Sequence, residues 1–458
     1  MASTSTELSD EKTIIPAREN TQDCKDSGVK PWTFNGDKPI ESPCKLIRTK
    51  PPLELGPNLL GLGKIEKGIR LPTGTIWQPA LYLLGSIRSA ISIEKTAGEE
   101  NASEWSNRAD VFLNLQLSST ERLMLGLTPI NNGANFTGYQ FSPDSNQGGF
   151  DNLNSDIDTL WFEGDFGELF PRLKNQQRKS LDIGFSIGRQ VIAFQDSVMM
   201  NDAIDSLVLV KNNLHLIKHA PSTRLSMVYA WNNINRADGS QDDSARFFGL
   251  FSETDTWRRT INIDWAYMTS DQEADGGFIG ISSSQRIGHW SSIIRLNNSY
   301  TSQTETTNMR NGTLLSTQLN RSLTGSHNLF YVNVFAGFDE YRAATRDADV
   351  GSGIGVAGIS FAAQGLGRYS SAISQETDHS YGMAAGIQWF LNKQKSNIIL
   401  ELAGKHQDQV LEKNQQAISL RFQKALGRRW MWQMDAYVAD QSHSQNNYGI
   451  RTELRILF

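Results

Sequence analysis

The feature that most constrains this chain is an alternation of apolar and polar residues with a period of two, which recurs from about Leu81 to the end. In Leu81–Ile93 the odd positions are mostly leucine and isoleucine, whereas the even positions include Ser86, Arg88 and Ser92. Successive side chains of a strand point to opposite faces, so such segments form strands with one apolar and one polar face. The pattern returns in segments 111–117, 123–127, 181–187, 225–231, 261–267, 330–334, 383–389, 398–402, 418–422 and 432–438.

Mean hydropathy is −0.42 over the 458 residues, and no stretch approaches the ~20 apolar residues that a membrane helix needs. A strand of a transmembrane barrel needs only ~10 residues with every second one apolar. The alternative is a soluble sandwich or propeller, whose strands would have to bring two apolar faces together in one core. Because the alternation continues over most of the chain, we expect an all-β, antiparallel, up-and-down transmembrane barrel over residues 76–458.

Short and long links alternate along the predicted strands. Ser118–Glu121 is a short link, whereas Asn131–Asp158 is a long one. Outer-membrane barrels have tight periplasmic turns and longer extracellular loops, so this order predicts that both termini are periplasmic. It also predicts about 18 strands (16–20), with Gly337–Ser380 as one long extracellular excursion. Two further strands, at 353–361 and 366–373, would raise the number to about 20.

The C-terminal segment ends on an aromatic residue after a regular alternation. It resembles the strand by which bacterial barrels are recognised by the outer-membrane assembly machinery, and its candidate recognition residues are Tyr448, Ile450, Leu454, Ile456 and Phe458. We expect this strand to pair with Leu81–Ile93, because an open edge cannot face lipid. Several tryptophans lie near predicted periplasmic turns, where aromatic girdles belong: Trp257, Trp290, Trp389, Trp430 and Trp432.

Residues 1–75 have no sustained period and are rich in proline. This segment is predicted to be an irregular extension that either plugs the barrel or lies as a periplasmic lead-in. Its two cysteines, Cys24 and Cys44, are expected to form a disulfide if the chain is exported, closing a loop worth ~3 kcal/mol. Two free thiols are the alternative.

The segment Ser186-Ile187-Gly188-Arg189-Gln190, with Phe194-Gln195-Asp196 and Asp202 after it, resembles a strand and loop of the alginate-export family of outer-membrane channels. The resemblance covers about 20 residues. It implies an 18-stranded barrel that passes an anionic polysaccharide. Physically, Gly188 permits a bulge at which Arg189 turns away from the lipid face. The alternative is an ordinary strand end with a surface arginine.

The alternation also assigns charged residues to the inner wall, because a charge facing lipid at the midplane costs ~2–4 kcal/mol. Such residues form ion pairs that stiffen a barrel, or a field at a constriction that orders polar solutes. The two signs are about evenly matched here, whereas the resemblance implies a cationic pore. The predicted lumen-facing residues are Arg88, Arg108, Asp110, Arg122, Glu163, Asp165, Asp182, Arg189, Arg224, Asp264, Arg295, Glu401, Arg421, Asp435, Arg451, Glu453 and Arg455.

The sequence offers little for catalysis, metal or cofactor binding. Its 7 histidines are scattered, and no HExxH, GxSxG or CxxCH pattern is present, so we expect no enzyme, no metal and no cofactor. A net charge of −5 without a basic run argues against nucleic acid.

The predicted function is a channel in the bacterial outer membrane for diffusion of polar or charged solutes. Its predicted partners are lipid, lipopolysaccharide and the assembly machinery. The alternative is a barrel sheath around a periplasmic or lumenal partner, such as a multihaem cytochrome in an electron conduit.

Overall fold

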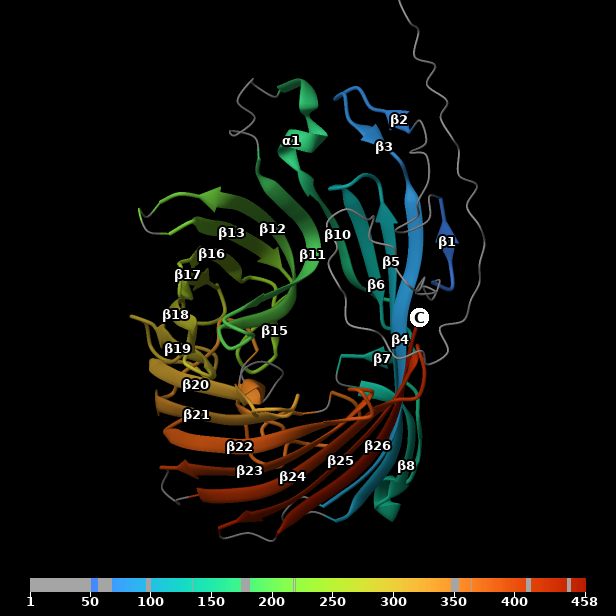
Figure 1. The fold of residues 1–458 in the computed structure, drawn as a ribbon, viewed down its shortest axis with the longest axis vertical. Helices are drawn as coiled ribbons and strands as arrows, with labels where there is room; N and C mark the ends of the chain where they lie inside the picture. Colours follow the sequence, from blue (N-terminus) through green and yellow to red (C-terminus); the bar gives the residue numbers. More distant parts are fainter. Residues whose placement is uncertain are drawn as a thin grey trace, which may run out of the picture. The chain divides into compact units, whose positions relative to one another are not determined.

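The computed structural model describes residues 51–56, 68–95, 100–133, 135–173, 182–216, 218, 220–346, 354–363, 365–408, 413–442 and 446–458. Residues 51–458 form one compact unit (Figure 1). Cys24 and Cys44 lie outside the described residues, so the expected disulfide stays a prediction. Within those residues no helix is both long enough and apolar enough to cross a membrane.

The unit is a closed antiparallel β-barrel of 18 strands, which confirms the predicted fold class and strand number. Consecutive wall strands pair with one another, β6 pairs with β10, and β26 closes the ring on β4. The wall strands are β4 (Ala80–Lys95), β5 (Ala102–Gln116), β6 (Arg122–Leu127), β10 (Ile157–Asp165), β11 (Gly184–Phe194), β12 (Met200–Leu214), β13 (Ser222–Asn232), β16 (Arg246–Asp255), β17 (Arg259–Thr269), β18 (Gly276–Ile287), β19 (Trp290–Tyr300), β20 (Gly312–Ser322), β21 (Leu329–Asp339), β22 (Ser380–Leu391), β23 (Ser396–Gln407), β24 (Lys413–Ala425), β25 (Trp430–Gln441) and β26 (Asn447–Leu457).

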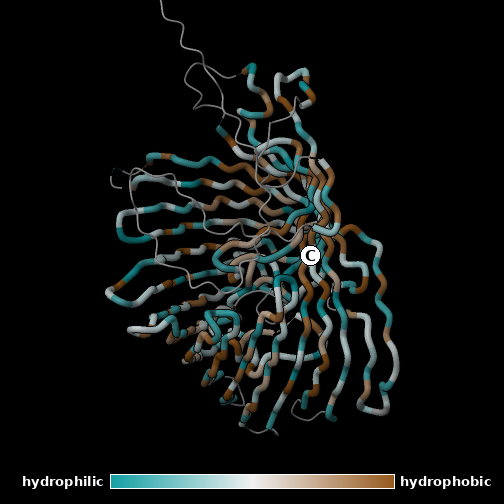
Figure 2. The backbone as a smooth tube through the Cα atoms, turned by 45° about the vertical axis from the view of Figure 1, so that its right-hand side comes forward, coloured by the Kyte–Doolittle hydropathy of each residue, from teal (hydrophilic) through white to brown (hydrophobic). Residues whose placement is uncertain are grey.

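Hydrophilic and hydrophobic residues follow one another along the strands of this wall (Figure 2). Ile87, Ile91 and Ile93 of β4 are large apolar side chains exposed on the outer face. Ser92 and Glu94 of the same strand are buried on the inner face. An apolar exterior over a polar interior is the arrangement that a membrane-spanning barrel requires.

The two ends of the barrel differ in their connections. We call the end that carries Phe458 and the short links the turn end, and the other the loop end. The predicted pairing of the first and last strands is confirmed, with Ile450 opposite Ile93 and Ile456 opposite Ile87. The long connection expected between β21 and β22 spans residues 340–379. The two additional strands considered at 353–361 and 366–373 are not formed in its described part, where 354–357 is a short 3-10 turn, η4 (Ile354–Ala357).

The long link after β6 folds back beside the wall. It contains β7 (Asn131–Asn132), β8 (Asn135–Ser142), η1 (Asp144–Asn146) and β9 (Gly148–Phe150). β8 pairs with Ser103–Asn107 of β5, whereas β6 pairs only with Val111–Gln116. The loop-end half of β5 therefore has β8 as its neighbour in place of the short strand β6.

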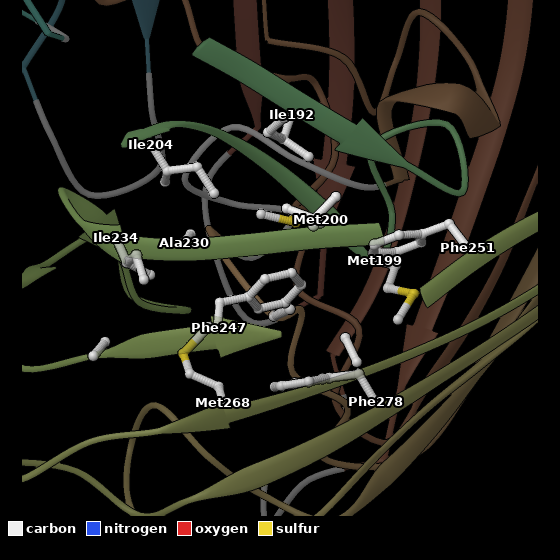
Figure 3. Close-up of a cluster of buried hydrophobic side chains, with 14 of the residues drawn as sticks. Ile192, Met199, Met200, Ile204, Ala230, Ile234, Phe247, Phe251, Met268 and Phe278 are labelled. Carbon is white, nitrogen blue, oxygen red and sulfur yellow. The ribbon is translucent and has the colours of Figure 1, made fainter. Parts of the chain in front are cut away.

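The β11–β12 hairpin leaves the wall at its loop end and enters the lumen. β10 pairs with β11 only as far as Arg189, and β13 pairs with β12 only from Asp205 onward. Gly188 lies at the departure point with φ +124°, and a Cβ there would lie 2.2 Å from the Leu160 carbonyl oxygen. Beyond it, apolar side chains of the hairpin pack on the inner face of β13 and β16–β18, and Figure 3 shows part of this cluster: Ile192, Met200, Ile204, Ala230, Phe247, Met268 and Phe278.

The described part of the N-terminal extension lies at the turn end and not in the lumen. β1 (Glu54–Leu55) pairs with Leu81 and Tyr82 at the start of β4. β2 (Ile69–Arg70) and β3 (Ile76–Trp77) form a hairpin, and its Thr75 hydroxyl donates to carbonyls of α1 (Phe166–Leu169), which η2 (Pro171–Leu173) follows. These contacts hold residues 51–56 and 68–79 at the turn end, and the plug and lead-in alternatives for the rest of residues 1–75 fall outside the described residues.

Candidate functional site

Two inward segments meet inside the barrel. The Ala344 amide donates to the Met199 carbonyl at 2.8 Å, and the Tyr341 hydroxyl donates to the Val198 carbonyl at 3.1 Å. Arg346 forms an ion pair with Asp202 at 3.1 Å. The tip of the β11–β12 hairpin and the 340–379 loop are thus joined to each other, and Figure 1 shows the loop, in orange, inside the ring of strands.

The 340–379 loop is anchored partly by apolar contacts with the inner wall. Phe361 and Ile373 are fully buried, and Phe361 meets Phe335 of β21 edge-on at 5.3 Å between ring centroids. Ile354 and Ala357 belong to the same cluster, together with Tyr437 of β25. These contacts fix the loop against the inner wall, since detaching it would expose its apolar side chains to water.

Three buried carboxylates of the wall hold the same loop through its backbone. Glu401 of β23, which has 0% exposure, accepts from the amides of Ile359 at 2.9 Å and Ser360 at 2.7 Å. Glu94 of β4 accepts from the Ser370 amide at 3.1 Å, and Glu104 of β5 accepts from the Arg368 amide. Hydrogen bonds to a charged acceptor are stronger than neutral ones.

A row of arginines lies on the inner wall where the first and last strands meet. Arg88 donates to both carboxylate oxygens of Glu453, at 2.7 and 2.9 Å, across the β4–β26 seam. Arg455 donates to the same carboxylate at 3.2 Å. The arginine row, as we use the term, consists of Arg88, Arg108, Arg421, Arg451 and Arg455, with Asp110, Asp435 and Glu453 as its carboxylates.

Within the row five guanidiniums face three carboxylates, and the loop-anchoring Glu94 and Glu104 lie further along the same strands as Arg88 and Arg108. Arg108 and Arg455 each keep 30% of their side chain accessible, whereas Arg451 is enclosed and lies 6.0 Å from the ring centroid of Tyr369. The Gly365 carbonyl of the loop points at the row, 3.5 Å from Arg88 and 3.4 Å from Arg108. The loop therefore lies directly beside the accessible guanidinium group of Arg108.

The structure places the other predicted lumen residues apart from this row. Arg122 pairs with Glu163 on β6 and β10. Arg295 pairs with Asp196 at the hairpin tip, and Asp264 accepts from Gln195 at 2.6 Å. Arg224 lies on β13, directly opposite Glu253 of β16.

Three residues differ from the predicted placement on the inner wall. Asp165 ends β10 and caps α1 by accepting from the Glu168 amide at 3.1 Å. Asp182 precedes β11 and is largely exposed at the turn end. Arg189 lies on the strand face opposite to that of Gly188, at the point where β11 turns inward. Its side chain forms an ion pair with Asp205 at 3.2 Å.

Sequence reasoning missed the anchoring carboxylates Glu94 and Glu104 and the buried phenol of Tyr331, which donates to Glu401. Glu94 continues the polar even positions of the first alternating segment, whereas Glu104 lies outside the alternating segments identified in the sequence. Nothing in the sequence connects them to a loop more than 260 residues later.

At the loop end, Arg236 is buried between β14 (Ile234–Asn235) and β15 (Gln241–Asp242). Burial lowers the pKa of Arg236, and nearby Asp242 partly offsets this. Burial by itself would raise the pKa of Asp242, but hydrogen bonds from Ser244 and Ser270, together with Arg236, hold that pKa below its ordinary value. This network ties the links after β13 and β17 to each other.

No family model matches the sequence, and no curated protein matches it. Solved structures do resemble the fold. A BenF-like porin from Pseudomonas fluorescens Pf-5 aligns at TM-score 0.56 and 11% identity, covering 82% of this chain and 98% of that chain. Pseudomonas aeruginosa OccK2 (OpdF) aligns at 0.55 and 9%, covering 82% and 97%. Acinetobacter baumannii OccAB3 aligns at 0.53 and 9%, covering 82% and 99%.

At these identities the comparisons show a shared fold: this chain has the barrel of outer-membrane porins. They support the coarser prediction of a porin-like barrel and do not support the alginate-export family.

Proposed function

We propose that this protein is an outer-membrane porin through which small anionic solutes diffuse along the arginine row. The observation that carries the proposal is the row itself, in which two guanidinium side chains are accessible and that of Arg108 lies beside the inward loop. Guanidinium groups bind carboxylates and phosphates in a planar, bidentate geometry, so an anion that passes the loop meets complementary partners.

The proposed orientation places the turn end in the periplasm and the loop end outside the cell. The support is the asymmetry of the connections and the tryptophans at the turn end, where Trp257 is 87% exposed. The sheath alternative is not favoured, because the β11–β12 hairpin and the 340–379 loop occupy lumen that a partner protein would need.

The test is ion selectivity of the purified protein in planar lipid bilayers under a salt gradient. The protein is expected to show step conductances and a reversal potential that indicates anion preference. Replacing both Arg108 and Arg455 by glutamine should shift the preference toward cations. Arg258→Gln, in the exposed turn between β16 and β17, is the matched control and should leave selectivity unchanged. A folded barrel without conductance would contradict the channel; an unchanged reversal potential in the double variant would contradict the role of the row.

A further inference from the structure

A cavity of about 360 Å³ lies under the inward hairpin, on a different part of the wall from the arginine row. Its lining comes from β11 and the hairpin tip on one side, and from the inner face of β12, β13, β16 and β17 on the other. The volume falls at the lower end of the ~300–1,000 Å³ typical of small-molecule sites. The cavity can therefore hold a short ligand.

One side of this cavity is an unpaired strand edge. β11 continues to Phe194, but its pairing with β10 ends at Arg189, so Gln190–Phe194 pair only with β12 among the described residues. Val191 and Ala193 line the cavity, and Val191 is 61% exposed. A free strand edge offers main-chain donors and acceptors in the spacing that another extended chain requires.

Two acceptor atoms at the cavity have no partner. Gln195 is 5% exposed, and its amide nitrogen is committed to the Asp264 carboxylate at 2.6 Å, which leaves its Oε1 as an acceptor. That oxygen and Oδ1 of Asn262 are buried and form no hydrogen bond with any described residue. Because both oxygens have almost no accessible surface, a ligand in the cavity contacts Gln195 and Asn262 through other atoms.

Opposite charges complete the lining. Arg224 and Glu253 are Cα partners on neighbouring strands, and both side chains are exposed within the cavity. In the described part of the chain they form no ion pair with each other or with another group. Because directly opposite residues of neighbouring strands lie about 5 Å apart, the guanidinium and the carboxylate are side by side in the lining.

We infer that this cavity is a second solute subsite, which binds short peptides as an added strand on the β11 edge. Main-chain amides of the peptide pair with β11, and its carboxylate meets Arg224. At ~3.3 Å per residue, two or three residues match the five-residue edge with room for the charged ends. The inference rests on the proposed function only in that a porin gives peptides access to the lumen.

The test is calorimetric titration of the folded, full-length protein in detergent with trialanine, with single-channel recording alongside. Trialanine is expected to bind and to interrupt the current at the same concentrations. Trialanine with N-methylated amides, which keeps both charges but loses the main-chain donors, should bind about tenfold or more weakly. Arg224→Gln should weaken trialanine about tenfold, whereas Arg258→Gln should not.

The outcomes separate the two proposals. Absence of trialanine binding, or equal binding of the N-methylated peptide, overturns the subsite even if the channel conducts. Binding with the expected discrimination in a protein that does not conduct supports the subsite and overturns the porin. Retained affinity in Arg224→Gln overturns the placement of the peptide carboxylate.

Discussion

Replacing Glu401 by glutamine should loosen the 340–379 loop without unfolding the barrel. The Glu401 carboxylate accepts from two backbone amides at 2.7 and 2.9 Å and from the Tyr331 hydroxyl, at a site with 0% exposure. Glutamine keeps one acceptor oxygen and turns an NH2 group toward the second amide. The amide N–H that faces this NH2 group is then a buried donor without an acceptor, which costs ~1–3 kcal/mol. The remaining hydrogen bonds no longer have a charged acceptor, which costs a further ~1–2 kcal/mol.

The expected cost is therefore ~2–5 kcal/mol, opposed by no new contact. At about 1.4 kcal/mol per factor of ten, the fraction of molecules with this part of the loop detached should rise roughly 30-fold to several thousand-fold. The apolar anchor at Phe361 remains, so the change should be local.

Hydrogen exchange by mass spectrometry on residues 354–363 measures this directly, and single-channel recordings should show added current fluctuations. Ser419→Ala is the matched control, because it removes only the neutral 2.8 Å hydrogen bond to the Ser360 hydroxyl, worth ~0.5–1.5 kcal/mol. If Glu401→Gln exchanges no faster than Ser419→Ala, the carboxylate does not anchor the loop and the reasoning fails.

Three further predictions concern the wall and the loop end. Gly188→Ala should prevent the inward turn of the hairpin, since its Cβ would meet a backbone oxygen at 2.2 Å; altered conductance with a normal heat-modifiable band on gels would show this. Leu454→Asp with Ile456→Asp should reduce insertion, because each substitution places a carboxylate on the lipid face at a cost below the ~2–4 kcal/mol of a basic residue at the midplane, and normal outer-membrane levels would contradict the facing of β26. In the folded protein the pKa of Asp242 lies below its ordinary value of 3.8. The stabilisation that its ionised carboxylate gives the loop-end network is therefore present above pH 3.8 and is lost as the pH falls through the folded-state pKa. Pepsin cleavage within 233–245 should then increase.

The wall was predictable because a period of two is a local property of the sequence. Each strand from β4 to β26 sorts its own side chains, and the short turns separate the strands. The inner position of Arg88 and Glu453 follows from this alternation alone. Their ion pair does not, since it depends on which strands become neighbours when the ring closes.

The lumen was harder to predict, because its shape depends on contacts between distant segments. The loop after β21 is rich in glycine and serine, as any surface loop would be, and its inward path depends on Glu94, Glu104 and Glu401 from three other strands. Arg189 was misplaced for a related reason. Alternation predicts whether a side chain faces the lumen only while its strand stays in the barrel wall, and β11 leaves the wall at Gly188.

The ion pair between Arg88 and Glu453 joins residues that are 365 positions apart, on the first and last strands of the ring. Until those strands meet, the two halves of the arginine row belong to opposite ends of an open sheet, and neither half carries the charge pattern of the finished lumen. Completion of the ring and completion of the arginine row are therefore a single event, and a barrel that stalls before closure lacks the row altogether.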